Sequence, residues 1–225
     1  MNTNITKRIH INPQSKGSLG QSFEAEFRTA WLDYHGIHWN GSDLDDRHHS
    51  FADRHPDQVQ SYKLGSDDES KSTMLGLFRN VSRNDAPVHV IDCRALADGL
   101  IVQALESLQL LESLATQGIR FTFFLFPSED TESMSNLLDL FYFAGDRVDY
   151  AVVHNPAKVR TNLFKKSNIE AELKKFGAKE LTALRPLIDA ALLCELVCNT
   201  LVQKPAEHLF RSNYQPQRVM TAIGG

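Results

Sequence analysis

Hydrophobic residues in this chain fall into short, nearly continuous runs, separated by longer stretches in which they recur every three or four positions. The short runs are typical of strands that are buried on both faces of a sheet. We therefore expect strands at residues 8–11, 88–92, 121–126 and 150–153, with a further brief apolar segment at 37–39.

The periodic stretches predict amphipathic helices over residues 23–36, 101–118, 128–141, 167–176 and 188–201, with a shorter one at 75–81. The stretch 40–72 is dense in Asp, His, Ser and Arg, and we expect most of it to be loop. Strands that alternate with helices predict a single doubly wound α/β domain, with a mostly parallel sheet and helices on both faces. We expect this domain over residues 1–203 and a loosely ordered tail at 204–225.

Composition narrows the class of protein. The 225 residues are 42% hydrophobic and 23% charged, as in ordinary globular domains. The 24 Lys and Arg against 28 Asp and Glu give a net charge of −4, which excludes a globally basic nucleic-acid-binding protein. Three cysteines are too few for a disulfide scaffold. The N-terminal residues lack a signal-peptide pattern, and the apolar run 187–202 is too short and too charged to span a bilayer. We expect a soluble cytoplasmic protein that makes no membrane contact.

The first predicted strand runs into a small-residue loop and then into a helix, with Gly17 and Gly20 in the loop. Such a loop turns backbone N–H groups toward one point, where the helix dipole also favours an anion. A P-loop adds a Lys for the phosphates and a Ser or Thr for magnesium. Here Ser22 is present, but Gln21 occupies the lysine position and Ser15 replaces the first glycine. A plain helix-entry turn fits these residues nearly as well.

Four segments in this order resemble the ParA/MinD family of P-loop ATPases. The loop 16–22, KGSLGQS, resembles the deviant Walker A sequence KGGVGKS of that family. Asp43-Leu44-Asp45 is similar to its switch I element, and Val90-Ile91-Asp92 to its Walker B strand. The segment 152–155, VVHN, resembles the strand that ends in a base-recognising Asn. Residues 43–51 and 177–179 look most like the TraL-type and StbB-type proteins of plasmid conjugation and stability loci. The resemblance spans about residues 8–186.

The resemblance implies a role for each matching residue. Lys16 would reach a phosphate across an ATP-sandwich dimer, and Asp45 would position the attacking water, so these two are the catalytic candidates. Ser22, Asp45 and Asp92 would hold magnesium, and Asn155 would contact adenine. The nucleotide-binding candidates are Ser15, Lys16, Gly17, Ser18, Leu19, Gly20, Gln21, Ser22 and Asn155.

One departure from the family pattern decides the expected activity. Gln21 removes the cation that neutralises charge on the β- and γ-phosphates, and phosphoryl transfer depends on such stabilisation. We therefore expect ATP and Mg²⁺ to bind weakly or not at all, with poor hydrolysis. The resemblance implies work in plasmid maintenance, partition or conjugation, through a homodimer and a protein partner. A slow but active ATPase, in which Lys16 compensates, and a structural adaptor with a vestigial phosphate loop are the alternatives.

Two other groups of residues suggest different chemistry. His48, His49 and His55 lie among several aspartates, a combination that can hold zinc or manganese, although a solvated loop explains them more simply. Lysines at 165–166 and 174–175 could form a nonspecific DNA-binding patch with Arg160, although acids at 170 and 172 favour an ordinary solvated helix face.

Overall fold

A computed structural model of the protein describes residues 5–14, 19–45, 48–94, 97–155, 164, 169–175 and 178–182. Within these ranges, seven strands form one sheet in the order β3-β2-β4-β1-β5-β6-β7, and every neighbouring pair is parallel. The strands are β1 (Lys7–Ile11), β2 (Trp39–Asp43), β3 (Val59–Ser61), β4 (Val88–Asp92), β5 (Ile119–Leu125), β6 (Asp149–His154) and β7 (Lys179–Thr182).

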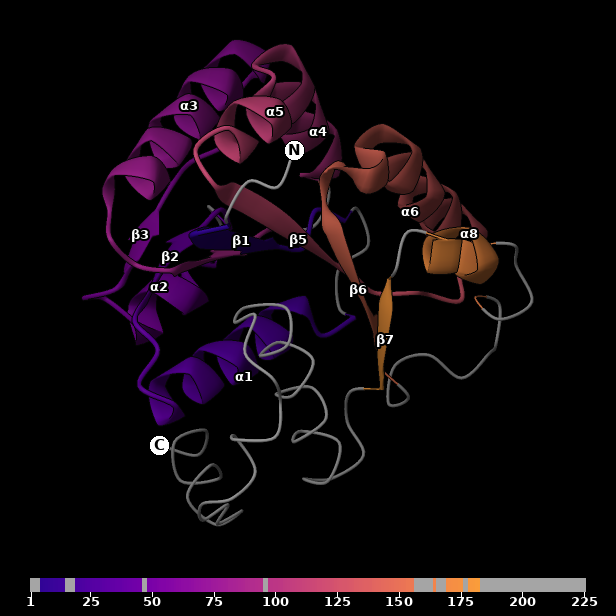
Figure 1. Ribbon diagram of the computed structural model, residues 1–225, viewed down its shortest axis with the longest axis horizontal. Coiled ribbons are helices and arrows are strands. Elements are labelled where there is room, and N and C mark those ends of the chain that lie inside the picture. Colours follow the sequence, from indigo (N-terminus) through magenta and orange to yellow (C-terminus); the bar gives the residue numbers. More distant parts are fainter. Residues whose placement is uncertain are drawn as a thin grey trace.

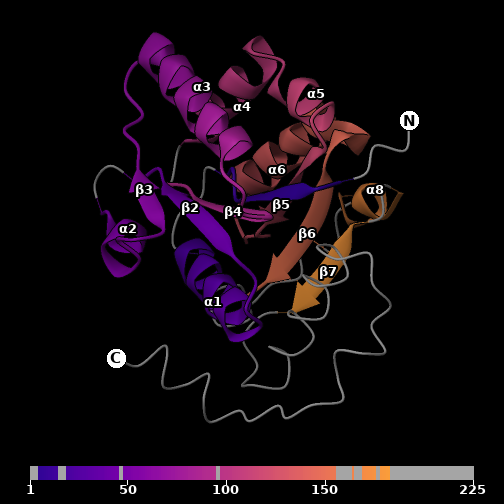
Figure 2. The same ribbon diagram turned by 60° about the vertical axis from the view of Figure 1, so that its left-hand side comes forward.

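Helices cover both faces of the sheet (Figures 1 and 2). One face carries α3 (Asp67–Arg83), α4 (Asp98–Ser107), α5 (Leu110–Ala115) and α6 (Thr131–Ala144), which leads into the 3-10 turn η1 (Gly145–Arg147); α8 (Ile169–Lys175) lies beside α6. The other face carries α1 (Gln21–Tyr34) and α2 (Ser50–Arg54). The predicted doubly wound, parallel α/β domain is therefore confirmed.

Buried side chains alternate between the two faces of the sheet because neighbouring residues of a strand point to opposite faces. Ile9 and Ile11 of β1 pack with Phe121 and Phe123 of β5 in the larger core beneath α3–α6. On the α1 face, Trp39 heads a smaller core together with residues of α1, α2 and β4. The polar ends of the strands lie beyond these cores, and the candidate site is there.

The predicted strands at 8–11, 88–92, 121–126 and 150–153 are confirmed within a residue or two. Two local caps explain where helices begin. Ser66 and Glu69 form a capping box at the start of α3, and the Asp130 carboxylate accepts the Glu132 N–H at the start of α6.

Several element predictions were wrong. The stretch 40–72 holds β2, α2, β3 and the first turn of α3, rather than mainly loop, and α3 is much longer than residues 75–81. The helix predicted over 101–118 is two helices, because the backbone of Gln109 adopts the left-handed conformation, with φ of 48°. Strand β7 was not expected. The helix expected at 188–201, the boundary at 203–204 and the tail lie outside the described residues.

Candidate functional site

The loop before α1 reaches the helix through Gly20, whose φ of 102° only glycine adopts readily. Asn155, which follows β6, is buried and donates a hydrogen bond from Nδ2 to the carbonyl oxygen of Leu19, at 2.8 Å. A Cβ atom on Gly20 would lie 2.8 Å from that same Nδ2. The last part of the loop is therefore held against the carboxyl end of β6 by a contact that requires a glycine at position 20.

Gln21 turns its side chain back onto the loop. Its Oε1 accepts the N–H of Leu19 at 3.2 Å, and the side chain is half-buried. A neutral amide thus lies at the position where the P-loop pattern has a lysine, and it supplies no charge there. The preceding candidates, Ser15, Lys16, Gly17 and Ser18, lie outside the described residues, so their assigned roles stay predictions.

Asp92 ends β4 directly beside this turn, and only 2% of it is exposed. The Ser22 hydroxyl, at the start of α1, hydrogen-bonds to the Asp92 carboxylate. Burial, with a smaller contribution from the neighbouring Asp43, raises the pKa of Asp92 to about 7, against the opposing effects of Ser22, Asn12 and Arg28. The structure therefore brings together Ser22 and Asp92, two of the three residues predicted to hold magnesium.

Asp92 is short of hydrogen bonds for so buried a group. Its Oδ1 has no hydrogen-bond partner among the described residues, and the same holds for Nδ2 of Asn12, which lies near it. The other end of the Asn12 amide is engaged, because Oδ1 accepts the N–H of Cys93 at 3.1 Å. An unpartnered, buried carboxylate oxygen is the kind of group that a hydrogen-bond donor or a cation would satisfy.

Asp43 lies opposite Asp92 in the register of β2 and β4, but its carboxylate makes different contacts. Its carboxylate accepts the backbone N–H groups of Asp45, at 2.8 Å, and of Phe51 and Ala52, at 3.2 and 3.1 Å. Burial raises the pKa of Asp43, and these three donors oppose that rise. Asp43 therefore organises the chain between β2 and α2.

Asp45, the third predicted magnesium residue and a catalytic candidate, is half-buried at the start of that connection. Its Oδ1 accepts the backbone N–H of His48 at 3.2 Å. The backbone N–H of Asp45 donates a hydrogen bond to the Asp43 carboxylate, and this contact links Asp45 to the site. Its role in positioning water stays a prediction.

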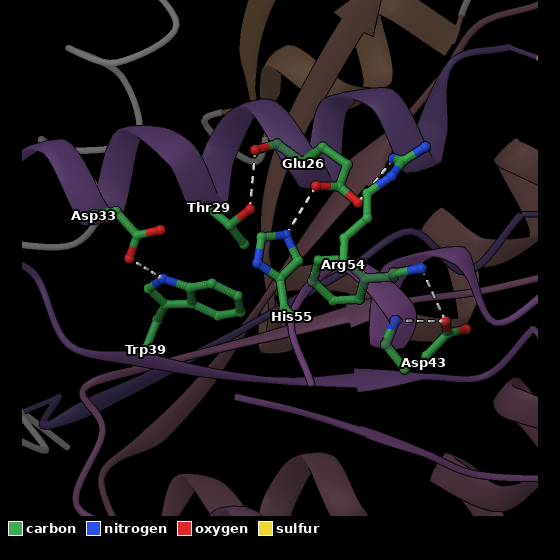
Figure 3. Close-up of polar contacts among 9 residues, drawn as sticks. Glu26, Thr29, Asp33, Trp39, Asp43, Arg54 and His55 are labelled. Atoms are coloured by element: carbon green, nitrogen blue, oxygen red, sulfur yellow. Dashed lines mark hydrogen bonds and ion pairs between the residues drawn. The ribbon is translucent and has the colours of Figure 1, made fainter. Parts of the chain in front are cut away.

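Helix α2 is docked onto α1 by Glu26 (Figure 3). Glu26 Oε2 lies 2.8 Å from Nε2 of His55, and Oε1 accepts a hydrogen bond from Arg54 at 3.0 Å. The His55 ring also meets Trp39 and Phe51 edge-on, with centroids 5.2 and 5.4 Å apart. Glu26 was not expected from the sequence, because its partners are 28 and 29 residues away and no local signal reveals it.

A buried ion pair under α1 was missed too, although the sequence carried its signal. Glu24 and Arg28 are spaced as helical neighbours, and their charged groups lie 2.8 Å apart with 3% and 1% of the side chains exposed. The guanidinium lies over the ring of Phe124, 4.0 Å from its centroid. Arg28 is close enough to Asp92 to lower the pKa of that carboxyl group, so it contributes positive charge on the inner side of the site.

The alternative that the histidine cluster holds a metal ion gains no support in the part of the chain that the structure describes. There, no group of three His, Cys, Asp or Glu side chains is arranged to hold a metal ion. His55 is engaged by Glu26, and His48 and His49 are exposed. Of the predicted basic patch, Lys174 forms an ion pair with Glu170, whereas Arg160 and the lysines at 165–166 lie outside the described residues.

A scan against protein-family models finds no match to this sequence, and a search of curated proteins finds none. Solved structures do resemble the fold. One is the cell division protein MinD of Aquifex aeolicus, with 13% identity over 93% of this chain and 98% of that chain, and a TM-score of 0.41.

Two further matches are a nucleotide-binding protein from Archaeoglobus fulgidus in complex with ADP and FlhF complexed with GTP and Mg²⁺. The first has 13% identity over 94% of both chains and a TM-score of 0.41. The second has 13% identity over 86% of this chain and 76% of that chain, and a TM-score of 0.46. These likenesses concern the arrangement of strands and helices, and they assign no role to any residue here.

Among the helices within the described ranges, none is long and apolar enough to cross a membrane.

Proposed function

We propose that the chain is a ParA/MinD-like nucleotide-binding protein whose phosphate site lies at the β1–α1 turn. One observation carries the proposal: the Ser22 hydroxyl and the buried Asp92 carboxylate are hydrogen-bonded to each other beside a glycine turn that opens a helix. A helix N-terminus favours an anion, and the carboxyl ends of parallel strands are where ligands bind in open α/β sheets.

The residues at this place suit a magnesium ion. Mg²⁺ prefers oxygen ligands, commonly one or two carboxylates together with phosphate oxygens and water. Asp92 offers a carboxylate oxygen that lacks a partner among the described residues, and Ser22 offers an exposed hydroxyl. Asp45 would add a second carboxylate from the β2–α2 connection. When bound, the ion would neutralise phosphate charge, and Asp92 would be held in its ionised form.

Gln21 limits what such a site achieves. With its amide folded onto Leu19, it leaves the phosphates without the usual lysine, and the loss of a charge contact in a transition state costs about 3 kcal/mol. Binding is accordingly weak or absent, and hydrolysis is poor. In the alternative reading, a slow ATPase, Lys16 of a second protomer supplies the missing charge.

The biological part of the proposal rests on the resemblance to plasmid proteins of the TraL and StbB types. The chain acts in plasmid maintenance, partition or conjugation, through homodimerisation and a protein partner from that system. The competing reading is a structural adaptor that no longer uses nucleotide.

Calorimetric titration with MgATP tests the site, using the native chain, Gln21→Lys and Ser22→Ala. We expect little or no heat from the native chain and measurable binding by Gln21→Lys, because the lysine restores the missing charge. Adding Ser22→Ala to Gln21→Lys should abolish that gain. Sub-micromolar binding of MgATP with turnover by the native chain would overturn the hypothesis that its phosphate site is degenerate. Failure of Gln21→Lys to bind would overturn the nucleotide site itself and favour the adaptor.

A further inference from the structure

A second site lies on the opposite face of the sheet from α1. It is a cleft of about 460 Å³ between the β2–β3 end of the sheet and the last turns of α3. Its volume is within the range of small-molecule sites. The part of the sheet that forms it is visible beneath α3 in Figure 2.

The floor of the cleft is polar where a helix-covered sheet is normally apolar. On β1 and β5, this face is aliphatic or aromatic and belongs to the core, apart from Lys7 at the start of β1, whose ammonium donates to the carbonyl oxygens of Val81 and Asn84. Toward the sheet edge, the same face presents Asn40 opposite His89 in the β2–β4 register, and Ser42 opposite Gln60 in the β2–β3 register. Four hydrogen-bonding side chains on three adjacent strands therefore form a continuous patch.

Helix α3 supplies the facing wall with Asn80, Arg83 and Asn84. Asn80 donates to the hydroxyl of Tyr62 at 2.9 Å, and that hydroxyl donates to Gln60 Oε1 at 3.0 Å. This chain of hydrogen bonds joins the helix wall to the floor. The cleft is thus bounded by side chains that hold one another in place.

Ser42 and His89 form the most buried part of the floor, with 1% and 4% exposed. Ser42 Oγ lies 2.8 Å from Nε2 of His89, and Nδ1 of His89 has no hydrogen-bond partner within the described part of the chain. Burial, assisted by the nearby ammonium of Lys7, lowers the pKa of His89 to about 3. The imidazole is therefore neutral at physiological pH, so it acts in hydrogen bonding rather than as a charged group.

Charge decides the class of ligand. Among the described residues that line the cleft, only Asp57 and Arg83 carry a charge, one of each sign, and carboxamides dominate the rest. A charged ligand would lose hydration here without gaining a net countercharge, whereas carboxamides both donate to and accept from a neutral molecule. We propose that the cleft binds a neutral ring compound that carries several hydrogen-bond donors and acceptors, of the size of a nucleoside or a monosaccharide glycoside.

The cleft is independent of the proposed phosphate site. Asp92 lies on the α1 face of β4, in register with Asp43, whereas His89 lies on the α3 face of the same strand, in register with Ile9 and Asn40. Methyl α-glucoside carries neither phosphate nor base, so it reports on the cleft alone, whereas binding of adenosine is assigned to the cleft only when Asn40→Ala or Asn80→Ala weakens it.

The experiment titrates the full chain with two neutral probes, adenosine and methyl α-glucoside, followed by NMR or calorimetry up to about 10 mM. We expect saturable binding of one of them, which identifies the source of the ligand. Asn40→Ala and Asn80→Ala should each weaken that binding about tenfold, because each removes a carboxamide from the cleft.

Arg79→Ala is the matched control, since Arg79 precedes Asn80 on α3 but does not line the cleft, and it should bind as the native chain does. Two results would overturn the proposal: no saturable binding of either probe, or binding that Asn40→Ala and Asn80→Ala leave unaltered although both variants are folded by circular dichroism.

Discussion

At the scale of single residues, Gly20 and Asn155 fix the end of the loop before α1, together with the apolar packing of Leu19. The positive φ of Gly20 turns the chain into α1, and the Asn155 amide occupies the space that a side chain on Gly20 would need. The resemblance to the ParA/MinD family implies that Asn155 contacts adenine, but here its Nδ2 donates a hydrogen bond to the carbonyl oxygen of Leu19. Its recognition of a base stays a prediction.

Gly20→Ala should lower the free energy of unfolding by about 1–3 kcal/mol, because alanine is strained at this φ and its Cβ displaces the Asn155 amide. Chemical denaturation measures the change. Gly76→Ala is the matched control: Gly76 lies inside α3 with nothing within 4 Å of an added Cβ, so alanine should stabilise the chain by about 0.5–1 kcal/mol. Equal effects of the two substitutions would contradict the geometry described for Gly20.

His89 makes the folded chain sensitive to acid. Its pKa is about 3 in the folded protein against 6.5 for the free side chain, so the unfolded chain binds the extra proton first. Stability from the neutral ring is complete above pH 6.5 and is lost as pH falls from there toward 3. Between about pH 7.5 and about pH 5 the loss attributable to His89 is about 2 kcal/mol.

His89→Gln should remove this part of the pH dependence, because glutamine keeps a hydrogen-bonding group near Ser42 but does not titrate. Urea midpoints of both proteins at the two pH values provide the measurement. His10, whose pKa burial also lowers, remains in both proteins and leaves a residual acid sensitivity. A variant as sensitive as the native chain would show that His89 is not the buried neutral group described.

At the scale of elements, α2 is stabilised by tertiary contacts at both of its ends rather than by its own helical hydrogen bonds. Asp43 accepts the backbone N–H groups of Phe51 and Ala52, and Glu26 of α1 contacts Arg54, the last residue of α2, and His55, which follows it. Five residues are too few for a stable isolated helix, so these tertiary contacts determine whether α2 forms. The formation of α2, and of its contact with α1, therefore depends on a few charged groups.

Glu26→Gln should accelerate hydrogen exchange of the α2 amides severalfold, since a neutral amide replaces the carboxylate that binds His55 and Arg54. Mass spectrometry after deuterium exchange resolves this segment. Arg54→Ala is the control, because Arg54 has 63% of its side chain exposed and its ion pair should contribute little. If Arg54→Ala had the same effect as Glu26→Gln, the contact to His55 would not be the one that holds α2.

Elements with a strong local pattern could be predicted, and those that depend on distant partners could not. The strands at 88–92 and 121–126 are apolar on both faces, and this burial is visible in the sequence. The sequence of β2, Trp-Asn-Gly-Ser-Asp, has the polar composition of a loop, because the residues on its α3 face line a polar cleft. Of the site, the pairing of Ser22 with Asp92 was implied by the resemblance to the ParA/MinD family. The contacts of Glu26 required the folded structure, whereas the helical spacing of Glu24 and Arg28 was visible in the sequence.

At the scale of the whole molecule, the candidate site has acids at the ends of two adjacent strands and no lysine at position 21. The guanidinium of Arg28 offsets part of the negative charge of these acids, but Arg28 is already paired with Glu24. A bound MgATP would still carry net negative charge, and a second cation near its phosphates is the contribution that Lys16 of another protomer would make in the ParA/MinD arrangement. Nucleotide binding and self-association should therefore be coupled, each strengthening the other by the same factor.

We expect sedimentation velocity to show a shift toward dimer when Gln21→Lys protein is given excess MgATP, and a smaller shift for the native chain, because the added lysine raises occupancy of the site. Lys16→Ala in the Gln21→Lys background should bind nucleotide but stay monomeric, since it removes only the charge offered to the partner. Lys71→Ala is the control, because Lys71 pairs with Asp68 on α3 and should not alter association. Dimerisation that is independent of nucleotide, or unaffected by Lys16→Ala, would contradict the ATP-sandwich arrangement and leave the adaptor as the better account of this chain.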